Sequence, residues 1–347
     1  MMSDKNLLQV SNLTVEFDTE DGTVRAVNKV DLSIKPGETV TIVGESGSGK
    51  SVTAQTVIGT LPMPPARIVS GDIDFDGIDL LSLKPAARRK LAGSRIAMIS
   101  QDAQSALDSR FTVGYQISEM FHHHRGWSWK RSKAAAVELL RKVQIPNAEV
   151  RVNEYPHQFS GGMQQRAVIA AAISLDPQLL IADEPTTALD VTVQAEIMQL
   201  LQDLKDDLGL SMILVTHDLA QAYEISDRVV VMYAGRIVEA GTRDQIFQSP
   251  AHPYTRGLLA AMPRIDRSSA ELSIIPGTTP NLVNLPSGCS FHPRCSHCTA
   301  ICREEIPEIV DIGNTQTSAC HFAEDIKQLR SPVADDNEVA NDIEVAQ

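Results

Sequence analysis

The chain has 347 residues, 43% of them hydrophobic and 22% charged, which is enough apolar material for about two domains of roughly 100–200 residues. Its 31 Lys and Arg against 44 Asp and Glu give a formal net charge of −13, which argues against a basic nucleic-acid-binding surface. No apolar run approaches the ~18 residues of a membrane span, and the first residues lack the pattern of a signal peptide. We therefore expect a cytosolic protein whose membrane contacts go through partners.

Short β-branched runs alternate with helical patterns, which predicts an α/β domain with a parallel sheet. The expected buried strands are residues 39–43, 95–99, 178–182, 211–215 and 228–232. Residues 191–208 carry apolar side chains at the 3.6-residue period and end at Gly209, which predicts an amphipathic helix.

Helix formers replace strand signals from about residue 103, and we expect a helical subdomain over about 103–172 inserted in the α/β core. Prolines then punctuate a loop-rich region, which places a domain boundary near residue 262. The segment from 331 to 347 holds five acids and no Lys or Arg, and we expect it to be a disordered acidic tail.

The first chemical motif is Gly-Glu-Ser-Gly-Ser-Gly-Lys-Ser at residues 44–51, directly after a predicted strand. Glycines allow backbone N–H groups to surround phosphate oxygens, Lys50 neutralises them, and the Ser51 hydroxyl can coordinate Mg²⁺. The helix that follows offers its positive end to the same phosphates. The motif predicts an ATP site lined by Gly44, Ser46, Gly47, Ser48, Gly49, Lys50, Ser51 and Val52.

Two further motifs extend this site. An apolar run, residues 179–182, ends in Asp183 and Glu184, at the strand edge where open α/β sheets bind ligands. We expect Asp183 to hold Mg²⁺ through water and Glu184 to polarise the attacking water. Ser160, followed by two glycines, reads as the N-cap of an apolar helix; a second anion-binding helix terminus suggests that two surfaces meet at one nucleotide.

The order of these motifs, with Gln101, Asp190 and His217, resembles the nucleotide-binding subunit of an ABC transporter. Residues 155–160 (Tyr-Pro-His-Gln-Phe-Ser), 232–235, 252–255 and the Cys-containing stretch 288–321 resemble the dipeptide/oligopeptide importer ATPases. The resemblance covers about residues 6–325. It implies an α/β P-loop NTPase of the ABC ATPase fold, with a RecA-like core, an antiparallel β subdomain, a helical subdomain and a small loop-rich C-terminal extension. The implied division is an ABC ATPase domain at 1–262, the extension at 263–330 and the acidic tail at 331–347.

The resemblance also implies roles for matching residues. The catalytic residues would be Lys50, Gln101, Glu184 and His217, and the Mg²⁺ ligands Ser51, Gln101 and Asp183. The signature residues, which would face the nucleotide of a second cassette, are Ser160, Gly161, Gly162, Met163 and Gln164. Asp190 resembles the aspartate that crosses the cassette interface. Phe17 stands where an aromatic stacks on adenine, with Arg25 as the alternative contact.

All five cysteines lie between residues 289 and 320. From their spacing alone, zinc and an iron–sulfur cluster are equally good readings, and reduced thiols without metal are a third. The resemblance favours a 4Fe–4S cluster on Cys289, Cys295, Cys302 and Cys320, with Cys298 at a position where the family has another residue type.

The function implied is an ATP-hydrolysing subunit of an ABC importer at the cytoplasmic face of the cell membrane. Its expected partners are two transmembrane permease subunits, a second ATPase subunit (a paralogue rather than a copy) and an extracytoplasmic solute-binding protein, with no nucleic acid. The solute, a dipeptide, an oligopeptide, nickel or another small molecule, is left open. The alternative is a soluble ABC ATPase acting on ribosomes or DNA; such proteins usually carry two cassettes or a long coiled coil, and this chain shows one cassette and no heptad run.

Overall fold

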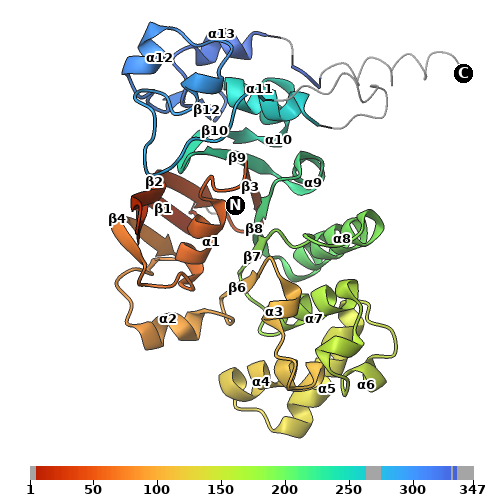
Figure 1. The fold of residues 1–347 in the computed structure, drawn as a ribbon. Coiled ribbons are helices and arrows are strands. Elements are labelled where there is room, and N and C mark those ends of the chain that lie inside the picture. The colour runs from red at the N-terminus through yellow and green to blue at the C-terminus, as the bar shows by residue number, and fades with distance from the viewer. Residues whose placement is uncertain (1–4, 263–274, 330, 334–347) are drawn as a thin grey trace, which may run out of the picture.

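The computed structural model describes residues 5–262, 275–329 and 331–333, which form two β-sheets with surrounding helices (Figure 1). The antiparallel sheet has the order β2-β1-β4-β5. Its strands are β1 (Leu8–Thr19), β2 (Gly22–Ile34), β4 (Ala66–Phe75) and β5 (Ile78–Asp79). The larger sheet has the order β11-β12-β10-β9-β3-β8-β7-β6. Its strands are β3 (Thr39–Val43), β6 (Ile96–Ile99), β7 (Leu179–Asp183), β8 (Ser211–Thr216), β9 (Arg228–Tyr233), β10 (Arg236–Thr242), β11 (Val310–Asp311) and β12 (Thr317–Ser318).

The centre of the larger sheet is parallel, as the sequence predicts. Strand β3 pairs in parallel with β8 and β9, β8 pairs with β7, and β7 pairs with β6. All five residues of β3 are buried, Thr39 and Thr41 among them, because the strand is covered on both faces of the sheet. Each of the five predicted strands coincides with a strand of this sheet to within one residue at either end.

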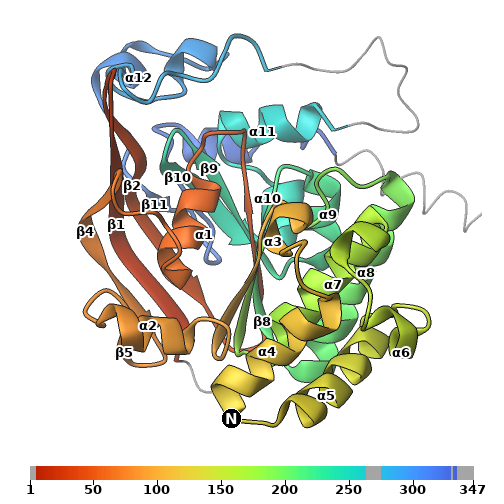
Figure 2. The ribbon, with the colours of Figure 1, turned by 60° about the horizontal axis from the view of Figure 1, so that its bottom comes forward.

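Helices connect these strands, and the helices between residues 103 and 173 form a helical lobe. The helices are α1 (Lys50–Ile58), α2 (Pro85–Leu91), α3 (Ala103–Ala106), α4 (Val113–Arg125), α5 (Trp129–Lys142), α6 (Ala148–Arg151), α7 (Gly161–Ile173), α8 (Val191–Leu208), α9 (Leu219–Ile225), α10 (Arg243–Gln248), α11 (Pro253–Ala260), α12 (Ala300–Glu304) and α13 (Ala323–Lys327). No strand interrupts the run from α3 to α7, which occupies the expected helical insertion. In both ribbon views α4, α5 and α6 lie at the end of the molecule opposite α11 and α12 (Figures 1 and 2).

The buried apolar side chains form three clusters. One lies between the two sheets and includes Ile42, Val57 and Phe75. The second joins the helical lobe to β6, β7 and β8. The third includes Tyr233 and Tyr254, and it packs these residues against Phe291 of the C-terminal extension. The expected C-terminal extension therefore shares a buried cluster with residues that precede residue 262.

The extension also adds strands to the larger sheet. Strand β12 pairs with β10, and β11 pairs with β12. Glu239 on β10 is fully buried there, and its carboxylate accepts hydrogen bonds from the backbone N–H groups of Ala251 and His252 and from the Gln316 amide. Of the expected acidic tail, residues 334–347 lie outside the described residues, as do 263–274 at the expected domain boundary. Within the described chain, no helix is both long enough and apolar enough to cross a membrane.

Candidate nucleotide-binding site

The phosphate loop connects β3 to α1, and its glycines are required by close backbone approaches. Gly44 has a φ of +152°, and a Cβ there would lie 2.2 Å from the Met232 carbonyl oxygen. Gly49 has a φ of +101°, and a Cβ there would lie 2.3 Å from the Ala26 carbonyl oxygen. Positive φ and missing space both exclude a side chain, so the loop can form only with glycine at these positions.

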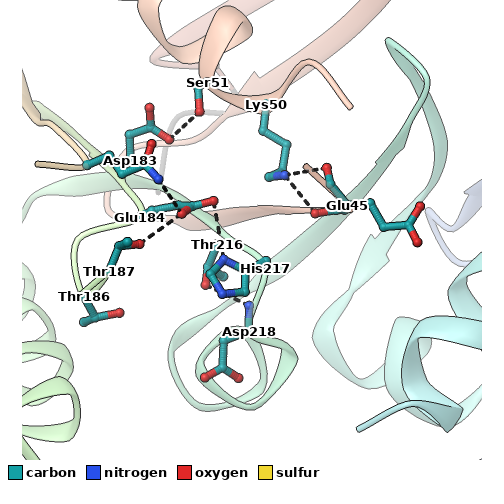
Figure 3. Close-up of polar contacts among 12 residues, drawn as sticks. Glu45, Lys50, Ser51, Asp183, Glu184, Thr186, Thr187, Thr216, His217 and Asp218 are labelled. Carbon is teal, nitrogen blue, oxygen red and sulfur yellow. Dashed lines mark hydrogen bonds and ion pairs between the residues drawn. The ribbon is translucent and has the colours of Figure 1, made fainter. Parts of the chain in front are cut away.

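Lys50 begins α1 and turns its ammonium group back into the loop (Figure 3). Its Nζ donates hydrogen bonds to the carbonyl oxygens of Gly44 at 2.8 Å and Glu45 at 2.9 Å. The residue is 5% exposed. Burial lowers the pKa of the Lys50 ammonium, and the carboxylates of Glu184, Asp183 and Glu45 oppose this effect. A buried cation beside the glycine-rich loop is suited to bind phosphate oxygens.

Ser51 and Asp183, the predicted Mg²⁺ ligands, lie side by side. The Ser51 hydroxyl donates to the Asp183 carboxylate at 2.8 Å, although the two residues come from α1 and β7. Burial raises the pKa of Asp183, and the Ser51 hydrogen bond acts in the opposite direction. Hard oxygen ligands from a hydroxyl and a carboxylate suit Mg²⁺, which keeps the rest of its octahedron for water and phosphate. These residues therefore fit the ion that the sequence predicts.

Glu184 follows directly after β7, in a left-handed conformation with a φ of +47°. Its Oε2 accepts hydrogen bonds from the Gln101 amide and the Thr187 hydroxyl, both at 3.0 Å. His217 Nδ1 lies 3.4 Å from Glu184 Oε1 (Figure 3). The structure thus brings together three of the predicted catalytic residues, and it adds Thr187, which sequence reasoning missed.

These side chains meet because neighbouring parallel strands end at one edge. The phosphate loop follows β3, Gln101 lies two residues after β6, Asp183 ends β7, and His217 follows β8. Since the strands run side by side in the order β3-β8-β7-β6, residues from distant parts of the chain converge at their carboxyl ends. Ligands of open α/β sheets bind at this edge.

The signature segment lies at the start of α7, in the helical lobe and away from α1 (Figures 1 and 2). Ser160 is its N-cap, and the side chain accepts from the Met163 N–H at 3.3 Å. Gly162 lies close to α8, since a Cβ there would be 2.7 Å from Val193 Cγ1. The side chain of Gln164 is buried and donates to the Pro156 carbonyl at 2.8 Å, so it braces the preceding turn.

Asp190 and Phe17 also occupy defined positions. Asp190 is the N-cap of α8, and its carboxylate accepts from the Val193 N–H at 3.0 Å. Phe17 lies on β1, half-buried against the cluster between the sheets. Arg25, the alternative adenine contact, forms an ion pair with Glu16 at 2.8 Å.

Four of the five cysteines line one pocket in the extension: Cys289, Cys295, Cys302 and Cys320. Cys298 does not line this pocket, and its Sγ lies 3.5 Å from the Thr299 carbonyl oxygen. Burial raises the pKa of Cys289, that of Cys295 to about 11 and that of Cys320 to about 12. Across the described ranges, no three His, Cys, Asp or Glu side chains form a group that could hold a metal ion. The iron–sulfur cluster therefore stays a prediction.

Comparison with known proteins places this site in a family. The ABC transporter family model matches residues 27–187, and the model for the oligopeptide/dipeptide transporter C-terminal region matches residues 238–302. The chain is 48% identical to the oligopeptide transport ATP-binding protein OppD of Bacillus subtilis, over 89% of this chain and 87% of that protein. The chain belongs to the ATP-binding subunits of ABC transporters. It is also 43% identical to the dipeptide transport ATP-binding protein DppD of Escherichia coli, over 91% of this chain and 96% of that protein.

A solved dimeric ATP-binding cassette in a post-hydrolysis state, bound to ADP and Pi, has the same fold. It superposes with a TM-score of 0.61 at 28% identity and covers 68% of this chain and 98% of its own. The predicted ABC ATPase fold and ATPase activity are therefore confirmed. OppD and DppD are named as ATP-binding transport proteins, and neither favours the alternative of an ATPase acting on ribosomes or DNA.

Proposed function

We propose that this chain is an ATP-hydrolysing subunit of a membrane importer for dipeptides or oligopeptides. The observation that carries the proposal is the contact of Glu184 with Gln101 and His217, beside the Ser51–Asp183 pair. The peptide class is supported by the names of the relatives and by the match of the C-terminal extension.

Each residue of this group has a role in hydrolysis that follows from its chemistry. The Lys50 ammonium and the loop amides bind the β- and γ-phosphates. Ser51, Asp183 and Gln101 would hold Mg²⁺, which would neutralise charge on the phosphates when bound. Glu184 accepts a hydrogen bond from the attacking water and orients it towards the γ-phosphorus. His217, which is largely exposed at the same edge, contacts the γ-phosphate.

The signature segment acts on a second cassette in this proposal. Ser160 and the amides of Gly161 and Gly162 form a helix N-terminus that attracts anions, yet α7 lies in a different lobe from α1. Two cassettes placed head to tail would bring each signature to the partner's phosphate loop, with Asp190 and Met163 at the interface. We propose that the second cassette is a paralogue, and that two permease subunits and an extracytoplasmic solute-binding protein complete the importer.

We further propose a 4Fe–4S cluster on Cys289, Cys295, Cys302 and Cys320. Four thiols around one pocket are the donor set that such clusters use. The extension is rich in loops, so ligand bonds would contribute to its folding.

Anaerobic purification tests the cluster, with iron and acid-labile sulfide as the readouts. Cys289→Ser or Cys320→Ser should lose iron, whereas the matched variant Cys298→Ser should retain it, because Cys298 lies outside the pocket lining. Stoichiometric zinc without sulfide, or equal iron in all three variants, would contradict the assignment.

The composition of the intact complex tests the importer. The chain should be purified through an affinity tag from detergent-solubilised membranes, with its neighbouring permease genes co-expressed. We expect two permease subunits and one cassette paralogue in equal amounts, and ATP turnover that the solute-binding protein with peptide stimulates. Recovery of the chain with ribosomes and without permeases would refute the proposal.

A further inference from the structure

A buried arginine of the C-terminal extension forms an ion pair with the phosphate loop of the ATPase domain. Arg294 ends the short 3-10 helix His292–Arg294 and is 8% exposed. Its two terminal nitrogens donate to the two carboxylate oxygens of Glu45, at 2.7 Å and 2.9 Å. This is the paired geometry in which a guanidinium and a carboxylate bind most strongly. Glu45 is the second residue of the phosphate loop, so the contact joins two segments 249 positions apart.

The surroundings hold Arg294 in this position. Its Nε donates to the Pro276 carbonyl at 2.9 Å, and Nη1 also lies 3.3 Å from the Tyr233 hydroxyl. The rings of Tyr233 and Phe291 flank the guanidinium, each within 6 Å of its central carbon. These partners hold the guanidinium in one orientation, with its two terminal nitrogens facing the Glu45 carboxylate.

Glu45 is in turn fixed at its side chain and at both ends of its backbone. Its N–H donates to the Tyr254 hydroxyl at 2.8 Å, and its carbonyl accepts from Lys50 at 2.9 Å. Figure 3 shows its carboxylate pointing away from Lys50. The charge of this carboxylate still acts on the Lys50 ammonium. The following residues of the loop, Ser46 and Gly47, are exposed, whereas Glu45 is half-buried and forms the ion pair with the extension.

The ion pair between Arg294 and Glu45 affects the charge that a nucleotide would meet at the phosphate loop. A triphosphate is strongly anionic, and a free carboxylate on the loop that binds it would repel it. Arg294 neutralises this carboxylate and keeps it turned away. We propose that Arg294 is a positioning residue for ATP, through which the extension sets the affinity of the phosphate loop. The inference rests on the proposed nucleotide site.

A double-substitution cycle tests this inference on the full chain, with the affinity for MgATP as the readout. Arg294→Met removes the cation but keeps an unbranched side chain, and we expect ATP to bind about tenfold more weakly, about 1.4 kcal/mol. Adding Glu45→Gln removes the released negative charge, so the double variant should recover most of the lost affinity. In the assembled complex the KM for ATP should rise in Arg294→Met while kcat changes little.

Arg303→Met is the matched control, since Arg303 is an exposed arginine of the same extension, and it should bind ATP as the unmodified chain does. Unchanged binding in Arg294→Met would overturn the inference. A loss that Glu45→Gln does not relieve would overturn it too, because it would mean that the substitution only unfolds the extension. Failure of the unmodified chain to bind ATP would refute the proposed nucleotide site itself.

Discussion

Replacing Glu184 by glutamine tests the assignment of the hydrolytic base with little change to the structure. The glutamine oxygen can take the place of Oε2 and accept from Gln101 and Thr187, as the carboxylate does at 3.0 Å. The new amide nitrogen would face His217 Nδ1, 3.4 Å from the replaced oxygen, which can accept a hydrogen bond in the neutral ring. The local contacts are therefore preserved, and the loss is confined to the negative charge.

The magnitude follows from the role of that charge. A positioned general base contributes typically 10²–10⁴-fold to a rate. At about 1.36 kcal/mol per tenfold, this loss raises the barrier by about 3–5 kcal/mol. Folding stability should change by no more than about 1 kcal/mol, the net value of one hydrogen bond. We thus expect a chain that folds and binds ATP and that turns over at least a hundredfold more slowly.

The assay is steady-state ATP turnover in an assembled complex whose second site is already inactive, together with MgATP binding. Glu224→Gln makes the same chemical change at an exposed position on α9 and serves as the control. Near-normal turnover in Glu184→Gln would refute the assignment of the base. Loss of ATP binding would show instead that Glu184 holds the nucleotide.

Three further predictions address the phosphate loop, the signature and the buried Glu239 on β10. Gly49→Ala should weaken ATP binding by tenfold or more, because its Cβ would lie 2.3 Å from a carbonyl oxygen. Gly37→Ala, with open space around the Cβ, should leave ATP binding unchanged, and equal ATP affinities of the two variants would contradict the prediction. Ser160→Arg should spare ATP binding by the isolated chain and abolish turnover in the complex, and lost binding by the isolated chain would contradict the dimer argument. Burial raises the pKa of Glu239 from 4.5 to about 7, against the opposing effect of its hydrogen-bond donors. Its contribution to stability is therefore present below about pH 4.5 and is lost, by up to about 3 kcal/mol, as the pH rises through about 7. Urea unfolding of Glu239→Gln should give a correspondingly flatter dependence on pH, and a slope equal to that of the unmodified chain would contradict this.

The parts of the site that the sequence predicts are those with a local physical signature. A buried strand followed by glycines, a lysine and a serine admits few other structures, and residues 44–51 form the expected loop. Asp183 and Glu184 were predicted for the same reason, since two acids directly after four apolar residues belong at the end of a buried strand. Here the local sequence predicts where each residue lies on its strand or loop, and contacts with other segments, such as Ser51 with Asp183, then orient the side chains.

Contacts between distant segments could not be predicted in this way. Glu45 reads as a variable position of the loop motif, and its pairing with Arg294 depends on how the extension packs against Tyr233 and Tyr254. The buried side chain of Gln164, which bonds to the Pro156 carbonyl, likewise depends on the path of the preceding turn. The addition of β12 to the larger sheet requires a register that two residues cannot encode by pattern.

The measurement that tests the central claim most directly is ATP-driven uptake by the reconstituted importer. Proteoliposomes would contain this chain with the proposed permease subunits and the proposed paralogous cassette, with MgATP on the cassette side and the proposed solute-binding protein with labelled dipeptide on the other. We predict uptake that requires ATP and that falls with turnover in Glu184→Gln. ATP hydrolysis without any peptide uptake, or uptake that persists when this chain is left out, would contradict the account.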